Sequence, residues 1–351
     1  LVGVVDSGFP ILFANSEGSR ITPSVVWYSK ESSPVVGESA RRMMTVSPSE
    51  VVASVKRKIG SGEKCKVGDK ELSPEEVSSS ILSHLRDVAE EASGENFTKA
   101  VITVPAYFND SQRASTKSAA EMAGLDVVRI ISEPTAAAIA YGMDKMEDKS
   151  RIVVYDFGGG TFDVSILELS EGVFQVISTS GDTQLGGDDI DIAVADFIYH
   201  KAEGSSITET SSKVWALFLD AGRKCKEVLS SEKNYNIKIP FYDGVKSFEH
   251  AITIDTLNEI LRPIIEKTIS HCHKALIDSG FSKDDIDSII LVGGSSRIPL
   301  VHELVELFFD KKPDLSQNPD ESVALGAVTH GGVLSGALRE IILLDVTPLS
   351  L

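Results

Sequence analysis

The sequence predicts an α/β protein built from two lobes, and three observations support this prediction. Segments of strand character alternate with segments of helical character, the pattern from which α/β sheets are built. With 351 residues, the chain is too long for one ordinary hydrophobic core. Both halves also repeat one order of elements, with strands first, then helices, then a strand and a helix. The halves are therefore expected to be coarse duplicates.

The first half opens with short strands joined by turns, up to about Glu31. Helical patterns follow from about Gly37 to Lys58, and the glycine-rich residues 60–72 are expected to form a loop or a short hairpin. Ser73 as an N-cap and Pro74 in the first turn predict the start of a helix. This helix is expected to run to about Ser93. Periodicity and terminal glycines predict the other elements of the first half, which are strands over 99–108 and 125–131 and helices over 109–124 and 133–142.

The second half begins with a predicted hairpin over 151–168. Its apolar runs flank three consecutive glycines, which suit a turn between two strands. The other predicted elements are a strand over 173–180, a loop over 181–191, helices over about 188–203 and 211–230, a strand-like insert over 235–254, a helix over 256–279, a strand over 286–294, and helices over about 297–309 and 319–333.

Composition excludes several classes of partner. The chain holds 52 acidic and 34 basic residues, for a net charge of −18, so we expect neither a nucleic-acid surface nor an anionic-membrane surface. No run of 18 apolar residues and no charged leader are seen. Cys65, Cys225 and Cys272 lie far apart, which favours a reducing compartment over a disulfide framework. We expect the cytoplasm, with the plastid stroma or the mitochondrial matrix as alternatives.

The stretch DFGGGTFD, residues 156–163, is the first candidate for chemistry. Glycine-rich loops expose backbone N–H groups that suit a polyphosphate. The two carboxylates at its edges, Asp156 and Asp163, are the hard oxygen ligands that a hydrated Mg²⁺ takes. The alternative is a plain hairpin tip. The hydroxyl of Thr161 beside Gly158, Gly159 and Gly160 favours phosphate chemistry.

Two further glycine-rich loops are candidates for the same site. In LVGGSSRIP, residues 291–299, the glycines permit close approach of a flat ring, and Arg297 is suited to stacking on an adenine. In GDTQLGGDD, residues 181–189, Gly186 and Gly187 are expected to offer N–H groups to a phosphate where a helix begins. A plain structural turn remains the alternative for both loops.

Five stretches carry a resemblance to a known family. In order, they are VITVPAYFNDSQRASTKSAAEMAGLDVVRIISEPTAAAIAYG, YDFGGGTFDVSILEL, GDTQLGGDDID, LVGGSSRIPLV and NPDESVALGAV. Together they resemble the nucleotide-binding domain of the 70-kilodalton heat-shock (DnaK-type) chaperones, and the closing IILLDVTPLSL is similar to that family's interdomain linker. The resemblance implies an actin/hexokinase-type ATPase fold with a cleft for ATP or ADP and Mg²⁺. It implies a first lobe at 1–150, a second at 151–338, and the linker with the start of a peptide-binding domain at 339–351.

The same resemblance implies catalytic roles. Lys56 matches the lysine that orients the attacking water or stabilises charge on the γ-phosphate, and Thr161 matches the hydroxyl that contacts that phosphate. Asp156 and Asp163 match the acids near Mg²⁺, and Glu133 matches the glutamate that acts through the water shell of the metal. Phosphoryl transfer to water needs positioning and charge neutralisation, which such a set supplies. Without the resemblance, Lys56 would be read as a solvated residue on a helix face, and Glu133 as the first residue of a helix.

The resemblance also implies the residues around the nucleoside and those that report nucleotide state. The nucleotide-contacting set is completed by Lys226, Ser230, Gly293, Gly294, Ser295, Arg297 and Asp320. Pro105 and Arg113 match a proline switch and relay toward the linker residues Leu343, Leu344 and Asp345.

The chain departs from the family pattern in several places. The family's first phosphate hairpin, of the type Asp-Leu-Gly-Thr-Thr, is expected ahead of Leu1 as a twin of the 156–161 loop, so its neighbouring strand should lack a partner. Residues 60–72 are shorter than the family's segment, which reduces the cleft rim. Arg223 stands where the family has a ribose-contacting glutamate. The peptide-binding domain is expected after Leu351.

These patterns lead to two functional hypotheses, while the linker-like closing segment disfavours a third, a sugar kinase of the same fold. The first is an ATP-hydrolysing chaperone domain whose nucleotide state controls binding of unfolded client peptides by the C-terminal domain, with a J-domain co-chaperone and a nucleotide exchange factor as partners. The second is a non-hydrolysing nucleotide-binding relative that regulates a chaperone or serves as its exchange partner.

Overall fold

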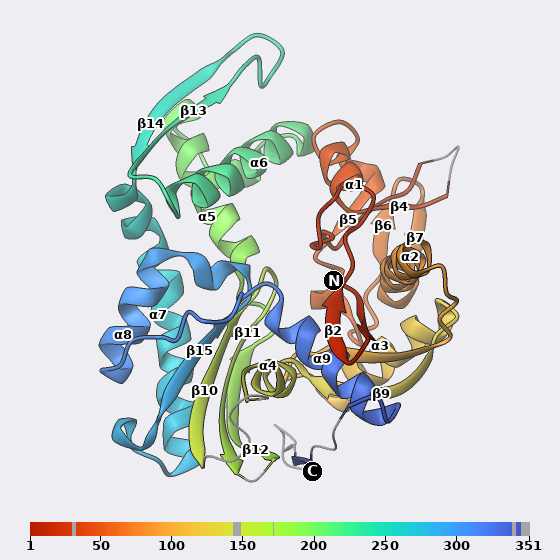
Figure 1. The fold of residues 1–351 in the computed structure, drawn as a ribbon. Helices are drawn as coiled ribbons and strands as arrows, with labels where there is room; N and C mark the ends of the chain where they lie inside the picture. The colour runs from red at the N-terminus through yellow and green to blue at the C-terminus, as the bar shows by residue number, and fades with distance from the viewer. Residues whose placement is uncertain (30–32, 143–148, 171, 339–341, 345–351) are drawn as a thin grey trace.

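The computed structural model describes residues 1–29, 33–142, 149–170, 172–338 and 342–344. Its second half is built on a five-stranded sheet with the strand order β15-β10-β11-β12-β16 (Figure 1). The hairpin β10–β11 pairs Asp156 with Asp163, and β10 runs parallel to β15. The strands are β10 (Ser150–Phe157), β11 (Phe162–Ser170), β12 (Val173–Asp182), β15 (Ser288–Val292) and β16 (Ile342–Leu344).

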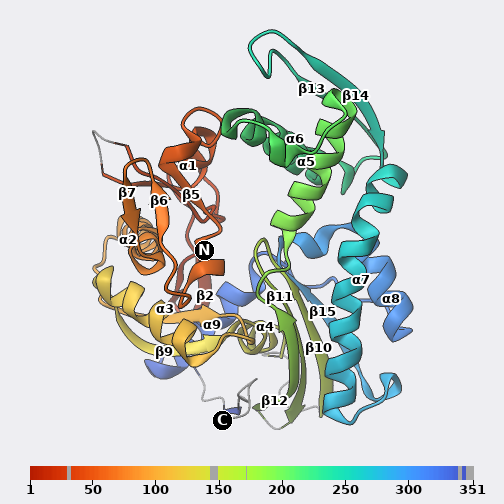
Figure 2. The same cartoon turned by 180° about the vertical axis from the view of Figure 1, so that it is seen from behind.

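Helices cover both faces of this sheet, which is why its central strands are apolar on both sides. Successive residues of β10 point to opposite faces, so Val153 and Tyr155 pack with α7 and α8, whereas Ile152 and Val154 pack with α4. Figure 2 shows α7 and α8 on one side of the strands and α4 on the other. These helices are α4 (Glu133–Gly142), α7 (Ile254–Ser279) and α8 (Pro299–Phe309).

A helical pair and a hairpin extend the second half beyond the sheet, at the top of Figure 1. Phe218 is fully buried between Tyr199 and Tyr242, with edge-to-face rings at both contacts. The elements are α5 (Gly187–Glu203), α6 (Ser212–Leu229), β13 (Asn234–Ile239) and β14 (Phe248–Thr253). They bring the start of α5 to the centre of the molecule.

The first half contains small sheets packed on helices. A reciprocal capping box between Ser73 and Glu76 starts α2, as the N-cap pattern predicted. The predicted hairpin within 60–72 is confirmed as β6 and β7. The elements are β3 (Val25–Trp27), β4 (Val35–Val36), β5 (Val51–Ala53), β6 (Cys65–Val67), β7 (Lys70–Leu72), α1 (Glu38–Met43) and α2 (Pro74–Ser93).

The prediction of helix from about Gly37 to Lys58 is wrong in its middle. The α-helix ends at Met43, and Val51–Ala53 form strand β5, which pairs with β3. Pro48 lies between the two elements, and the β-branched Val51 and Val52 favour a strand once β3 offers an edge. Tertiary pairing therefore overrides the local helical pattern.

Two further strand pairs complete the first half, and they do not pair with each other among the described residues. The hairpin β1–β2 is antiparallel and β8–β9 is parallel. Both pairs pack on α9, a helix that comes from the second half of the sequence and also packs on α4. The elements are β1 (Gly3–Asp6), β2 (Phe9–Leu12), β8 (Lys99–Val104), β9 (Asp126–Ser132), α3 (Asp110–Met122) and α9 (Ser322–Leu334).

The other element predictions hold, with ends shifted by a few residues. The three cysteines are free and buried, as their spacing indicated. Within the described part of the chain, no helix is long and apolar enough to cross a bilayer.

Candidate nucleotide-binding site

The three glycine-rich loops predicted for one site do meet. The Gly158 carbonyl accepts hydrogen bonds from the Gly187 N–H and the Ser295 hydroxyl, each at 2.9 Å. The Gly159 carbonyl accepts from the Asp188 N–H at 2.8 Å. The three loops, of which that of Ser295 is 137 residues from Gly158 in sequence, therefore form one unit where β10, β11 and α5 come together.

The glycines of these loops serve two different purposes. A Cβ on Gly186 would lie 2.4 Å from the Gly159 carbonyl oxygen, and Gly293 has φ +82° with the Phe157 carbonyl oxygen 2.5 Å from its would-be Cβ. Glycine is thus required at both positions by packing. In contrast, Cβ atoms on Gly158, Gly159 and Gly160 would find only ordinary contacts of 3.5 Å or more. The triple-glycine loop therefore keeps an open side.

The expected role of Gly186 and Gly187 as phosphate donors differs from the structure. The Gly186 N–H donates to the Asp189 carboxylate at 2.8 Å, and the Gly187 N–H donates to Gly158. Both N–H groups are used inside the protein because the start of α5 packs against the hairpin loop. The loop of Gly186 and Gly187 therefore supports the neighbouring Gly158–Gly160 loop. It does not offer the N–H groups of Gly186 and Gly187 to a phosphate.

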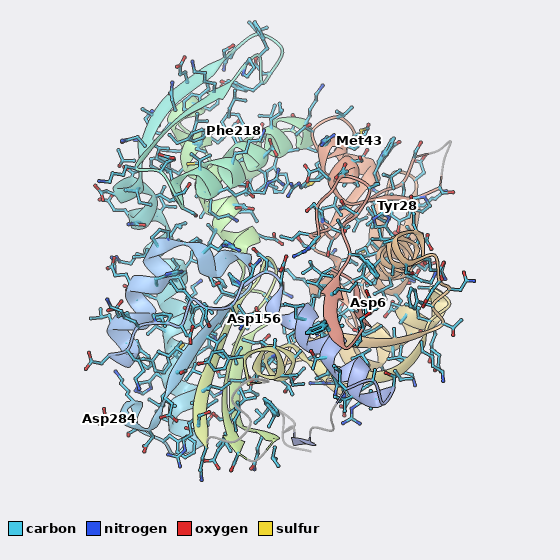
Figure 3. The ribbon with its side chains drawn as sticks, viewed as in Figure 1. Asp6, Tyr28, Met43, Asp156, Phe218 and Asp284 are labelled. Carbon is cyan, nitrogen blue, oxygen red and sulfur yellow. The ribbon has the colours of Figure 1, made fainter. Side chains whose placement is uncertain are left out.

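Four charged side chains from four elements form the second part of the site. Lys56, in the short 3-10 turn Val55–Lys58, places its Nζ 2.7 Å from Glu133 Oε1 at the start of α4. Asp156 and Asp163 lie directly opposite each other on β10 and β11, and their exposed fractions are 7% and 2%. Figure 3 places Asp156 in the middle of the molecule, between the two halves.

The electrostatics of this cluster are dominated by negative charge. Burial raises the pKa of Asp156 to about 7, with a further contribution from Glu133 and an opposing one from Lys56. Burial and the charges of Asp156 and Glu133 raise the pKa of Asp163 well above its ordinary value. Burial alone would lower the pKa of Lys56, but the three carboxylates outweigh it and raise that pKa.

One lysine faces three carboxylates, so an additional cation fits this charge. In the described part of the chain, no three or more acidic, histidine or cysteine side chains are arranged to hold an ion directly. The carboxylates of Glu133, Asp156 and Asp163 are hard oxygen donors, the kind that Mg²⁺ and its water shell take. When bound, such an ion neutralises phosphate charge.

The loop after β8 touches this cluster. The Tyr107 N–H donates to Asp163 Oδ1 at 3.1 Å. Arg113 donates to the carbonyls of Ala106 and Phe108 at 3.3 and 3.1 Å, and so braces the loop that begins at Pro105. Arg113 thus holds the two residues that flank Tyr107, whose N–H contacts the site carboxylate.

The predicted nucleoside residues are placed around the third loop and α6. Arg297 contacts Asp320 at 2.6 Å and Asn318 at 2.7 Å, and it lines a cavity of about 540 Å³. Gly294 is adjacent to Asp320, whose Oδ1 lies 3.3 Å from its would-be Cβ. Ser295 is buried against Gly158.

The three α6 residues singled out by the sequence differ in what they contact. Lys226 Nζ lies 2.6 Å from Asp191 Oδ1 and 3.5 Å from the Gly187 carbonyl, so it reaches the loops. The Ser230 hydroxyl donates to the carbonyl of Lys226 in its own helix. Arg223, the departure from the family pattern, pairs with Asp220 and lies 3.9 Å from Glu227 of the same helix. The acids of α6 therefore neutralise this arginine.

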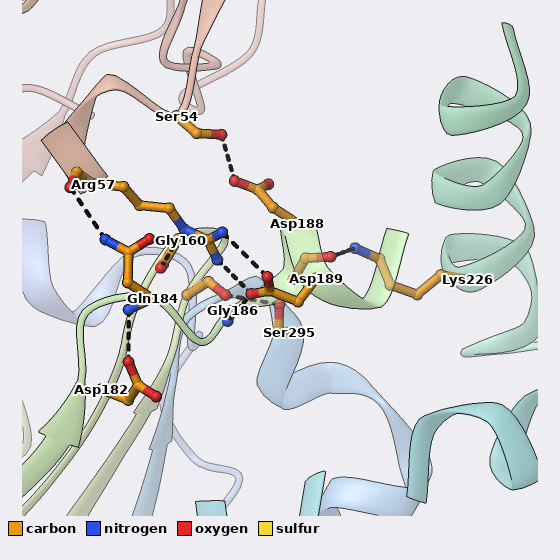
Figure 4. Close-up of polar contacts among 12 residues, drawn as sticks. Ser54, Arg57, Gly160, Asp182, Gln184, Gly186, Asp188, Asp189, Lys226 and Ser295 are labelled. Atoms are coloured by element: carbon orange, nitrogen blue, oxygen red, sulfur yellow. Dashed lines mark hydrogen bonds and ion pairs between the residues drawn. The ribbon is translucent and has the colours of Figure 1, made fainter. Parts of the chain in front are cut away.

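Contacts that the sequence did not predict tie the first half to the loops (Figure 4). Arg57 donates to the Gly160 carbonyl at 2.8 Å and pairs with Asp189 at 2.5 Å. The Ser54 hydroxyl donates to Asp188. The only sequence signal was a basic run next to Lys56 and two acids at a helix start, and the partners are more than a hundred residues apart.

The linker residues lie far from the glycine loops. Leu343 and Leu344 belong to β16 and pair with Phe174 and Gln175, at the end of β12 opposite to Asp182. Asp182 follows Gln175 by seven steps along the strand, which is about 23 Å. Asp345 lies outside the described residues.

Comparison with protein families agrees with this arrangement. The family profile described as Hsp70 protein matches residues 1–65 and 61–351, which together span the whole chain. The chain belongs to the Hsp70 family.

Proposed function

We propose that the chain is the ATP-binding and ATP-hydrolysing domain of a chaperone. The family supports an ATPase-type chaperone domain in general. For this chain, the observation that carries the proposal is the open side of the Gly158–Gly160 loop beside the cluster of Lys56, Glu133, Asp156 and Asp163. We also propose the actin/hexokinase-type arrangement, which the packing of α4 against α9 between the two halves supports.

The residues divide the chemistry of ATP hydrolysis between them. The loop N–H groups and the Thr161 hydroxyl bind phosphate oxygens, and Lys56 stabilises charge on the γ-phosphate or orients the attacking water. Glu133, Asp156 and Asp163 hold a hydrated Mg²⁺ through its waters. Gly294, Ser295 and Arg297 contact the nucleoside.

We further propose that nucleotide state is passed on through the loop of Pro105 and Arg113 to the linker of Leu343 and Leu344. This coupling serves a peptide-binding domain for unfolded clients, with a J-domain co-chaperone and an exchange factor as partners. The free, buried cysteines support a reducing compartment, for which we propose the cytoplasm, with the plastid stroma or mitochondrial matrix as alternatives.

A non-hydrolysing regulator is the second candidate. The observation that favours it is the pairing of Arg223 with acids of its own helix, which leaves the family's ribose contact without an equivalent carboxylate. Binding and turnover therefore have to be measured separately.

The test is a single-turnover measurement of ATP conversion to ADP by the purified protein with Mg²⁺, alongside calorimetric titration with ATP. We expect turnover in the parent protein and a loss of about 100-fold or more in Lys56→Ala. Lys58→Ala is the matched control, because Lys58 is exposed and pairs only loosely with Glu63 at 3.6 Å. Tight ATP binding without turnover would support the regulator instead.

A further inference from the structure

The turn that carries Lys56 is held on both sides of that residue by the start of α5. Before it, the Ser54 hydroxyl donates to the Asp188 carboxylate (Figure 4). After it, the Arg57 guanidinium pairs with the Asp189 carboxylate at 2.5 Å. The turn comes from the first half of the chain, whereas both carboxylates come from the second. The place of Lys56 in the site therefore depends on contacts between the halves.

Asp188 contacts two parts of the site at once. Its N–H donates to the Gly159 carbonyl at 2.8 Å, and its carboxylate accepts from Ser54. Gly159 is the middle residue of the open triple-glycine loop, and Ser54 comes two residues before Lys56. A few covalent bonds join the N–H of Asp188 to its carboxylate. This one residue therefore restricts the distance between the turn of Lys56 and the phosphate loop.

Within the first half, two buried apolar side chains anchor the turn. Val55 and Ile59 are 3% and 2% exposed, and they pack in different clusters. Apolar burial has no preferred direction, so it keeps the turn on the core without fixing its orientation. A hydrogen bond is directional, and the contact of Ser54 with Asp188 supplies that direction next to the lysine turn.

The backbone at Ser54 is unusual for a serine. Its φ of 54° and ψ of 29° lie in the left-handed region, which glycine adopts freely and which a Cβ makes unfavourable. Such a conformation persists where surrounding contacts hold it. One such contact is the hydrogen bond from the Ser54 hydroxyl to Asp188, which a glycine could not make. The hydroxyl thus gives a reason for serine at a position that favours glycine.

We propose that Ser54 and Asp188 are positioning residues for Lys56 in ATP hydrolysis. They act through the lysine, because their hydrogen bond sets where Lys56 lies relative to phosphates bound by the Gly158–Gly160 loop. This inference rests on the proposed ATPase function. Catalytic groups have to be held within about 0.5 Å of their productive place, and a misplacement of about 1 Å can cost about a hundredfold in rate. Loss of the contact should therefore slow turnover while the glycine loop still binds ATP.

Three variants test the contact in single-turnover hydrolysis at saturating ATP and Mg²⁺, with ATP affinity measured by calorimetry. Asp188→Ala removes the acceptor, and Ser54→Gly removes the donor while it suits the left-handed backbone. We expect each to lower the rate by about tenfold or more and to leave the dissociation constant of ATP unchanged. Asp188→Asn keeps an oxygen that accepts from the hydroxyl, so it should retain most of the parent rate.

Asp196→Ala is the matched control. Asp196 lies on the same helix as Asp188 and also accepts from a serine hydroxyl, that of Ser206 at 2.9 Å, but both of these residues belong to the second half. Asp196→Ala should lower the free energy of unfolding in urea and leave turnover unchanged.

A double variant tests whether the two side chains act as one contact. The protein with both Ser54→Gly and Asp188→Ala should be no slower than either single variant, since each change alone already breaks the contact. A rate reduced by the product of the two single losses would show independent effects and would overturn the proposal.

A second readout needs no ATP. Lys56 and Lys58 belong to the same turn, so brief acetylation with acetic anhydride, followed by mass spectrometry, compares their amines within one protein. In Asp188→Ala and Ser54→Gly, a displaced turn should weaken the pair of Lys56 with Glu133, now at 2.7 Å. We expect acetylation of Lys56 relative to Lys58 to rise by about twofold. Asp196→Ala should keep the ratio of the parent protein.

Four further results would overturn the proposal. They are an unchanged rate in Asp188→Ala, an equal loss of rate in Asp196→Ala, a loss of ATP affinity as large as the loss of rate, and an unchanged acetylation ratio. If Asp188→Ala is misfolded by circular dichroism, Ser54→Gly decides in its place. If the parent protein does not turn over ATP, the proposed ATPase function fails, and the acetylation ratio alone then decides whether Asp188 positions Lys56.

Discussion

Asp156 is predicted to destabilise the folded chain at neutral pH, so its neutral isostere should stabilise it. The carboxyl is 7% exposed and lies opposite Asp163, with Glu133 nearby. Functional sites often hold charges that the fold does not favour. The change Asp156→Asn keeps the shape of the side chain and removes the charge.

The magnitude follows from the pKa. The folded protein raises the pKa of Asp156 from 3.8 to about 7. Between these values the folded protein holds a proton that the unfolded chain has lost, so a rise in pH favours unfolding. Each pH unit in this window costs about 1.4 kcal/mol, for a total of at most about 4 kcal/mol above pH 7. The difference between variant and parent should therefore grow with pH and then level off.

The assay is urea unfolding followed by circular dichroism, in a chelating buffer without divalent cations, at several values between about pH 5 and pH 8. We expect the variant to unfold with a free energy about 2 to 4 kcal/mol above the parent near pH 8, and with a much smaller difference near pH 5. Asp284→Asn is the control, because Asp284 lies at the outer edge of the molecule in Figure 3; this variant should match the parent throughout.

A variant that is no more stable than the parent near pH 8 would show that the Asp156 carboxylate does not destabilise the fold. A gain of equal size at both ends of the pH range would contradict the prediction as well, since it would mean that ionisation of Asp156 is not the cause.

Three other predictions concern single contacts that stabilise the fold. Gly186→Ala should lower the free energy of unfolding by about 1 to 3 kcal/mol, because its Cβ would meet a backbone oxygen, and it should weaken ATP binding measured by calorimetry. Arg57→Ala should cost about 1 to 3 kcal/mol in urea unfolding, because it leaves the Gly160 carbonyl and the Asp189 carboxylate without their described cationic partner. Ser73→Ala should cost about 1 kcal/mol through loss of the α2 N-cap, measured by thermal melting.

Each of these has a matched control. Gly159→Ala should keep the stability of the parent, since its nearest contact would be 3.8 Å. Arg42→Ala, at an exposed position, and Ser79→Ala, inside α2, should change stability little. A loss in a control as large as in its partner variant would contradict the contact named for that partner.

Much of the fold was predictable because local patterns and tertiary structure agree. The hairpin over 151–168 has glycines between two apolar runs, and it is the centre of the sheet. The helix from Ser73 has its cap, proline and early acids in sequence, and it forms as predicted. The segment 37–58 was mispredicted because a long-range edge, β3, competes with its helical pattern.

The candidate site was predictable by residue type more than by arrangement. The glycine loops and the Lys56–Glu133 pair were identified from motifs and resemblance, and they come together in the structure. The use of the Gly186 and Gly187 N–H groups inside the protein was not predicted, nor was the contact of Arg57 with Gly160. A motif names the chemistry that residues can perform, whereas their partners depend on which loops the fold brings together.

The sequence by itself determined the order of strands and helices, the family, and the residues suited to phosphate chemistry, because these depend on periodicity and on side-chain type. Only the tertiary structure decided how one lysine is set against three carboxylates and which glycines are needed for packing. These features arise from contacts between segments far apart in the chain, and such contacts leave no local pattern.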